Sequence, residues 1–145
     1  MISGFDPGAL LARSYVLPRG PRVCLRLVRA RDREGVRRLF ERQGLDPDEL
    51  ELARLTRVDP RRRLVICATA LIGSAETVVG IGAIGLLDGE RARAAEAEAE
   101  AGPELVLVDE HATEGLRELL SEALVGRAQA LTHGRTMARA RRRAA

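Results

Sequence analysis

"RRRLVICATALIGSAETVVGIGAIGLL", residues 61–87, contains two continuous apolar runs, 64–72 and 77–87. Both runs are rich in β-branched residues, and the short turn Gly73-Ser74-Ala75 separates them. Runs of this kind are typical of buried strands, so the stretch predicts two paired strands that are covered on both faces of a sheet. Glycine and polar residues break both runs well short of the roughly 20 apolar residues that cross a bilayer, so no membrane association is expected.

The glycines of the second run, in "VVGIGAIG" (78–85), loosely match the spacing of a dinucleotide-binding loop. That loop needs a helix directly after it, and no helical pattern follows here. The glycines therefore indicate a β-bulge or a place where another part of the chain comes close to the backbone.

Upstream of this stretch the sequence predicts a hairpin and a first helix. Residues 15–30 alternate apolar and basic side chains, with a Pro-Arg-Gly-Pro turn at 18–21. Asp32 then precedes a segment whose apolar residues fall on one helical face, and Gly44 follows its last turn. We expect a helix that is capped at both ends, by Asp32 and by Gly44.

A second helix is predicted within residues 45–58. Asp46 is its expected cap, and Pro47 fits the first turn, where no amide donor is needed. Glu49 follows Asp46 by three residues, as a capping box requires.

The downstream part begins with a change of composition. Residues 88–103, "DGERARAAEAEAEAGP", contain no large apolar residue. Such a segment cannot bury enough surface to order itself against a core, so we expect a solvated loop insertion. A strand is predicted at 103–108, "PELVLV", and an amphipathic helix follows it. The apolar stripe of this helix consists of Leu116, Leu119, Leu120, Ala123, Leu124 and Leu131.

The two ends of the chain lack a core pattern. Residues 1–14 have no clear period, and no basic start precedes a long apolar stretch as in a secretory signal. Residues 134–145 form a basic tail with five arginines between positions 135 and 143. We therefore expect one soluble, cytoplasmic domain at 15–133, between an N-terminal arm and a solvated tail.

The overall composition agrees with a single domain. The chain has 145 residues, of which 46% are hydrophobic, and all 24 of its basic residues are arginine. Its net charge is +3. The order of elements predicts an α+β domain, an α/β sandwich in which helices flank a mixed, mostly antiparallel sheet.

Cysteine and histidine form no recognisable site. Cys24 and Cys67 lie singly in apolar strands, without the spacing of a metal site or a disulfide framework. They are expected to be core residues of a protein from a reducing compartment. His111 and His133 belong to different elements and lack a ligand pattern, so we expect surface or capping roles and no metal.

The order and spacing of these elements resemble the first two-thirds of a GNAT-type N-acetyltransferase, and more narrowly the bacterial protein-lysine acetyltransferase branch. The matching pieces are "LPRGPRVCLRLVRARDREGVRRLFERQ", "RRRLVICATA" and "VVGIGAI". The resemblance covers residues 16 to 131 and implies transfer of an acetyl group from acetyl-CoA to an amine. The family continues after this helix with a fifth strand, a further helix and closing strands, which this sequence lacks.

In this family the fourth strand runs into a helix through Gln/Arg-x-x-Gly-x-Gly/Ala, whose backbone amides hold the pyrophosphate of acetyl-CoA. Gly115 stands at the middle glycine, but Ala112 and Arg117 occupy the other two signature positions. The resemblance implies that acetyl-CoA would contact Val106, Val108, Gly115, Leu116 and Arg117.

Charge around this turn leaves two interpretations open. Glu110, Glu114 and Glu118 suit the positive end of the helix dipole, but they put like charge where a pyrophosphate would sit. Arg117 offsets one of them. The turn is either a phosphate site that has been weakened or an acid-capped helix start.

Glu104, in "PELVLV", matches the glutamate that this branch carries on its fourth strand. The resemblance implies that Glu104 is a general base for the attacking amine, which requires burial to move its pKa toward the working pH. The alternative is a glutamate at a strand start that faces solvent.

Three functions are compatible with these patterns. The first is a GNAT-like N-acetyltransferase that uses acetyl-CoA and acts on an amine or a protein lysine, although the lost signature residues weigh against activity. The second is a non-catalytic interaction module that completes its sheet by homodimerisation, or with a partner strand, at an exposed edge. The third is nucleic-acid binding by the arginine tail. This last partner is not expected, because the aromatic content of 2% offers no stacking platform and a solvated tail explains the charge.

Overall fold

The computed structural model describes residues 13–18, 20–86, 103–109 and 114–144. The predicted N-terminal arm up to residue 12 and residues 88–102 of the predicted insertion lie outside this part of the chain, as do Glu110, His111 and Ala112 of the turn.

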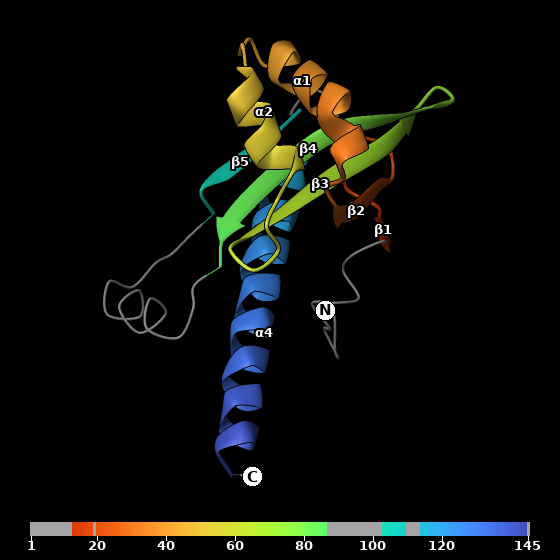
Figure 1. Ribbon diagram of the computed structural model, residues 1–145. Coiled ribbons are helices and arrows are strands. Elements are labelled where there is room, and N and C mark those ends of the chain that lie inside the picture. The colour runs from red at the N-terminus through yellow and green to blue at the C-terminus, as the bar shows by residue number, and fades with distance from the viewer. Residues whose placement is uncertain (1–12, 19, 87–102, 110–113, 145) are drawn as a thin grey trace.

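A five-stranded sheet forms the centre of the molecule (Figure 1). Its strands follow in chain order and each pairs antiparallel with the next. The predicted α+β class is confirmed, and every strand pair within the described residues is antiparallel, where the sequence suggested a mixed sheet. The strands are β1 (Arg13–Tyr15), β2 (Val23–Leu27), β3 (Arg63–Ile72), β4 (Ala75–Gly85) and β5 (Leu105–Val108).

The stretch quoted above forms the central hairpin of this sheet. Ile72 pairs with Ala75, so the turn consists of Gly73 and Ser74, and Gly73 adopts a positive φ of 67°. Residues 64–70 and 78–84 are all buried, as two apolar runs covered on both faces should be. The predicted first hairpin is also present, as β1 and β2, but β1 begins at Arg13, within the predicted N-terminal arm, and ends at Tyr15, so the hairpin starts two residues earlier than predicted.

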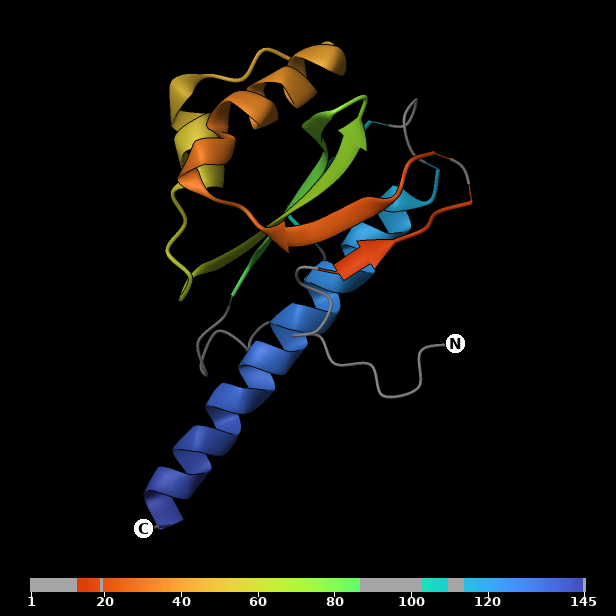
Figure 2. The same cartoon turned by 90° about the vertical axis from the view of Figure 1, so that its right-hand side faces the viewer.

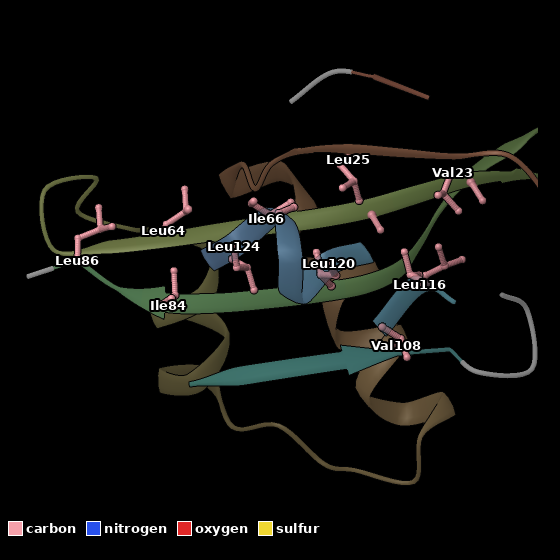
Figure 3. Packing of buried hydrophobic residues seen from close by; sticks show 14 residues of the cluster. Val23, Leu25, Leu64, Ile66, Ile84, Leu86, Val108, Leu116, Leu120 and Leu124 are labelled. Atoms are coloured by element: carbon pink, nitrogen blue, oxygen red, sulfur yellow. The ribbon is translucent and has the colours of Figure 1, made fainter. Parts of the chain in front are cut away.

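Helices cover both faces of the sheet (Figures 1 and 2). On one face lie a short 3-10 turn η1 (Ala30–Asp32), α1 (Arg33–Arg42) and α2 (Glu49–Thr56). On the other face lies α4 (Leu116–Ala144). Two separate hydrophobic clusters result, because the sheet divides the core. The cluster under α4 is drawn in Figure 3 and includes Val23, Leu25, Ile66, Val108, Leu116, Leu120 and Leu124.

The helix starts differ from the sequence prediction. Asp32 occupies the N-cap position of α1, as predicted, but its side chain makes no capping hydrogen bond there; its carboxylate Oδ2 accepts from the Arg29 amide at 2.6 Å and closes η1 instead. The cap of α2 is Asp48, two residues after the predicted Asp46, and its Oδ1 accepts from the Glu51 amide at 2.7 Å. The chain reverses after α1 through a hydrogen bond from the Leu45 amide to the Phe40 carbonyl, and α2 begins only after this connection is complete.

α4 packs directly on the glycines of β4. A Cβ atom at Gly82 would lie 2.5 Å from Leu124 Cδ1 and 3.2 Å from Leu120 Cγ, and one at Gly80 would lie 3.1 Å from Leu116 Cδ2. The β3–β4 register also shifts between Ala68 and Thr69, which is a β-bulge beside these glycines. The sequence predicted either a bulge or a close approach at the glycine-rich run, and the structure has both.

The helix continues far beyond the sheet. The sequence stripe ends at Leu131, yet the helical backbone runs to Ala144, so most of the predicted tail is part of α4. A helix of 29 residues is about 43 Å long at 1.5 Å per residue. Figures 1 and 2 show that its C-terminal half projects away from the sheet.

We expect Gly82→Ala to lower the free energy of unfolding by about 1–3 kcal/mol, because the new methyl group overpacks the contact with Leu124. Chemical denaturation followed by circular dichroism measures the change. Gly85→Ala is the matched control, since its Cβ would meet only the flexible end of Glu104. Equal stability of the Gly82 variant and the wild type would contradict the close packing.

Candidate functional site

The predicted site residues lie on β5 and at the start of α4. β5 pairs with β4, and none of the other strands that the structure describes pairs with its outer edge. The Asp109 amide donates to the Val79 carbonyl at 2.8 Å, so the residue after β5 turns its backbone toward β4. Because successive residues alternate in an antiparallel ladder, the backbone groups of Val106 and Val108 face the outer edge.

Arg117 reaches back from α4 to this edge. Its Nη1 donates to the Val106 carbonyl oxygen at 3.1 Å. A charged side chain placed over an edge strand hinders pairing with another strand. Arg117, which was expected to contact a cofactor phosphate, therefore donates a hydrogen bond to the backbone of its own sheet.

Gly115 has the conformation that a tight turn into a helix requires. Its φ is +85°, and α4 begins at the next residue. A Cβ atom at this position would have Pro18 Cδ as its nearest neighbour, at 3.7 Å, so the surroundings leave room beside the backbone.

Two predicted cofactor contacts are core residues. Leu116 is fully buried and Val108 is 2% exposed, and both belong to the cluster between the sheet and α4. Val106 is partly buried against the same cluster. Their apolar side chains are held by packing and have no polar atom to offer a ligand.

The described residues do not fit a tight acetyl-CoA site. Gly115 and the first amides of α4 suit a phosphate, but Glu114 and Glu118 are exposed beside them, and Arg117, the neighbouring cation that the structure describes, donates to Val106. The two carboxylates repel the pyrophosphate that the amides would attract.

Glu104 lies just before β5 with 51% of its side chain exposed. Its Oε2 accepts from Arg63 Nη2 at 2.8 Å, and its amide donates to the Ala83 carbonyl at 2.8 Å. The carboxylate is thus an exposed partner of an arginine on β3, and the burial that a general base of this kind needs is absent at Glu104.

Asp109 is fixed in the same way at the other end of β5. Arg42 of α1 places its Nε 3.1 Å from Asp109 Oδ2 and donates through Nη2 to the Val78 carbonyl at 2.6 Å. Arg42 and Arg63 therefore neutralise the carboxylates at both ends of the strand. Neither pair could be predicted, because the partners are 67 and 41 residues apart and no local pattern connects them.

A second polar cluster lies on the opposite side of the sheet from α4. Arg26 donates to both carboxylate oxygens of Asp32 at 2.7 Å, and to Glu76 Oε1 at 3.1 Å. The cluster borders a groove of about 450 Å³. The lining residues of the groove are Ser14, Pro21, Arg22, Cys24, Arg26, Thr69, Ala70, Leu71 and Glu76.

This cluster shifts the pKa values of its members. Burial alone would raise the pKa of Asp32, but the hydrogen bonds from Arg26 and from the Arg29 amide outweigh it and hold that pKa below its ordinary value. Hydrogen bonding to Asp32 raises the pKa of Arg26. The pair is ionised throughout the physiological range and fixes β2 to the start of α1.

The two cysteines are free thiols. Cys67 is fully buried in β3, and burial raises its pKa to about 12 despite the nearby Arg26. Cys24 is partly exposed and lines the groove. Cys67 is thus the unreactive core residue that the sequence predicts, whereas Cys24 is only partly covered.

Comparisons with known proteins return no relative. No protein-family model matches the chain, no curated protein matches it, and no solved structure matches it. Among the described residues, no helix is long and apolar enough to cross a membrane. In the same part of the chain, no group of three or more His, Cys, Asp or Glu residues could hold a metal ion.

We expect Asp32→Asn to lower the free energy of unfolding by about 3 kcal/mol, because it leaves the charge of Arg26 buried without its counter-ion. Since the pKa of Asp32 is lowered in the folded state, its contribution is present above about pH 4 and is lost as the pH falls through the folded value. Chemical denaturation at pH 7 and at pH 3 measures this effect. Between these two pH values the free energy of unfolding should fall less in the variant than in the wild type.

Glu76→Gln is the matched control for this experiment. Glu76 is 54% exposed, so its ion pair with Arg26 contributes about 1 kcal/mol or less. If both variants were equally stable at pH 7, the Arg26–Asp32 pair would not have the structural role assigned to it.

Proposed function

We propose that the chain is a non-catalytic interaction module that completes its sheet by pairing β5 with β5 of a second copy. The observation that carries this proposal is the outer edge of β5, where Val106 and Val108 direct their backbone groups away from β4. A strand added at such an edge gains main-chain hydrogen bonds without any change in the fold.

The residues required for acetyl transfer have other partners. Glu104 is bound to Arg63, and Arg117 donates to Val106. Val108 and Leu116 are buried in the core. A binding role uses the edge that these contacts leave available, whereas catalysis would require the hydrogen bonds of Glu104 and Arg117 to break.

The side chains of β5 suit pairing between identical strands. Val106 is half-buried on the face that α4 covers, and Leu105 and Leu107 are half-buried on the face of α1 and α2. In a two-fold antiparallel pair with Val106 opposite Val108, Leu107 meets its own copy, so both faces become more deeply buried. The carboxylates of Glu104 and Asp109 do not repel the second copy strongly, because Arg63 and Arg42 neutralise them.

Arg117 sets the strength of this association. Its hydrogen bond to the Val106 carbonyl must break before another amide can donate to that oxygen. Breaking it costs about 1 kcal/mol in each protomer, which makes the dimer weak and dependent on concentration.

We expect Arg117→Ala to tighten the dimer by about tenfold or more, because both protomers lose a competing hydrogen bond of about 1 kcal/mol. Val106→Pro should give a monomer, since it removes an outward amide while proline is tolerated on edge strands. Analytical ultracentrifugation over a concentration series measures both effects, with thermal melts to show that each variant folds.

Val16→Pro is the matched control, because Val16 is 76% exposed and follows β1 at the opposite edge of the sheet. It should dimerise as the wild type does. A strict monomer for both the wild type and Arg117→Ala would contradict the proposal, as would a Val106→Pro variant that dimerises normally.

A second candidate function is acetyl transfer from acetyl-CoA to an amine, such as a protein lysine. The observation in its favour is Gly115, which holds a left-handed conformation directly before α4, at the position that the resemblance assigns to the cofactor turn. Gly115 and the first amides of α4 would hold the pyrophosphate, and acetyl-CoA would supply the reactive thioester. Glu104 would have to leave Arg63 before it could accept a proton from the amine.

We expect no heat of binding and no thermal shift with acetyl-CoA up to millimolar concentration, because Glu114 and Glu118 repel the pyrophosphate. The double variant Glu114→Gln/Glu118→Gln removes this repulsion and should gain affinity by about tenfold or more, at about 1 kcal/mol for each charge. Micromolar binding by the wild type in isothermal titration calorimetry would favour the acetyltransferase over the interaction module.

A further inference from the structure

The positive charge of this chain is concentrated at its C-terminal end. Residues 127–145 contain six arginines and no acidic residue, and thus carry +6 in a chain of net charge +3, so the remaining residues carry −3. The sequence alone suggested a solvated tail, but the backbone of residues 132–144 continues α4. A helix fixes the spacing of these arginines, whereas a flexible tail would not.

Helical spacing places several of them on one face. Arg135, Arg139 and Arg142 follow at intervals of four and three residues, which brings them onto neighbouring turns of the same side. Arg143 follows Arg139 by four residues and widens this face. The backbone of the helix therefore places these arginine positions about 4.5–6 Å apart along its axis.

A second group of arginines lies at the same end of the sheet. α4 meets β4 first at Gly80 through Leu116 and then at Gly82 through Leu124, so it runs toward the end where β4 finishes at Gly85. Gly85 pairs with Arg63, and the connection before Arg63 contains Arg57, Arg61 and Arg62.

This connection is accessible. Arg57 and Arg62 are exposed, with 88% of the Arg62 side chain accessible, and both line a shallow groove of about 530 Å³. Arg62 approaches Asp59 only at 3.8 Å. Figure 1 shows the connection between α2 and β3 near the level at which α4 leaves the sheet.

We propose that this end of the molecule, formed by residues 132–144 of α4 and the connection at 57–62, binds the phosphate backbone of double-stranded nucleic acid without regard to sequence. Guanidinium groups suit phosphate, because their planar donors can bind two oxygens at once. A regular row of cations matches the regular phosphates of a duplex, and the release of counterions drives the binding.

Two other anionic partners fit less well. A helix that lies on a membrane needs a broad apolar face, and residues 132–144 contain one large apolar residue, Met137. Single-stranded nucleic acid is held largely by stacking on aromatic side chains, and the whole chain has two Phe, one Tyr and no Trp. A duplex backbone requires neither feature.

The test is fluorescence anisotropy of the full chain with a dye-labelled DNA duplex, titrated at several salt concentrations. If five arginines contact phosphates, the logarithm of the binding constant should fall with the logarithm of salt with a slope of about −4.5. The variant Arg135→Gln/Arg139→Gln/Arg142→Gln should bind about 100-fold more weakly at 0.1 M salt, and its slope should be smaller in magnitude by about 2.7. Glutamine preserves helix propensity, and circular dichroism verifies the helix.

Arg57→Gln/Arg62→Gln should reduce the slope by about 1.8 if the connection contacts the same duplex. The matched control Arg22→Gln/Arg31→Gln/Arg38→Gln removes three exposed arginines at positions remote in sequence from both groups and should retain the wild-type slope. The absence of duplex binding at low salt would overturn the proposal. It would also be overturned by an equal loss in the control variant, or by stronger binding to phosphatidylserine vesicles than to the duplex. If the Arg57→Gln/Arg62→Gln variant bound the duplex as the wild type does, the proposal that residues 57–62 contact the duplex would be wrong.

Discussion

The contact between α4 and the glycines of β4 is the constraint on which the rest of this structure depends. Leu116, Leu120 and Leu124 pack where Gly80 and Gly82 carry no side chain, so the helix lies closer to the sheet than any larger residue would allow. This contact closes the core on one face and fixes the direction of α4. It therefore also determines where Arg117 meets β5 and where the arginine-rich half of the helix leaves the sheet (Figure 2).

The side chains around the β5 edge favour strand pairing over acetyl transfer as the proposed function. Arg63 and Arg42 neutralise the carboxylates at the ends of the strand, and Arg117 donates to the Val106 carbonyl between them. Two of these contacts, those of Glu104 and Arg117, use groups that the proposed acetyl transfer would need, but they leave the main chain of β5 accessible to another strand. A side-chain hydrogen bond such as that of Arg117 can be broken at modest cost, which suits reversible association of the edge strand.

Much of the fold could be predicted from local patterns, because buried strands and amphipathic helices leave a periodic signal. The central hairpin, the bulge near Gly80 and the helix that begins at Leu116 were all predicted in this way. The cap of α2 was predicted two residues too early, at Asp46, because the connection after α1 delays the start of the helix. Asp32 was placed correctly before α1, but its carboxylate bonds to Arg26 and to the Arg29 amide and does not cap the helix. The ion pairs of Glu104 and Asp109 could not be predicted from the sequence, because their partners come from distant elements that only the assembled fold brings together. That the turn at Gly115 binds acetyl-CoA, as the family resemblance implies, stays a prediction.

The most direct test of the central claim is amide hydrogen exchange of β5, measured by NMR at low and at high protein concentration. The outward amides of Val106 and Val108 should exchange rapidly in dilute solution and become protected as the concentration rises. The Asp109 amide, which donates to Val79, should be protected at every concentration. Rapid exchange of Val106 and Val108 at all concentrations would contradict the account, because the edge of β5 would then have no partner in a second copy.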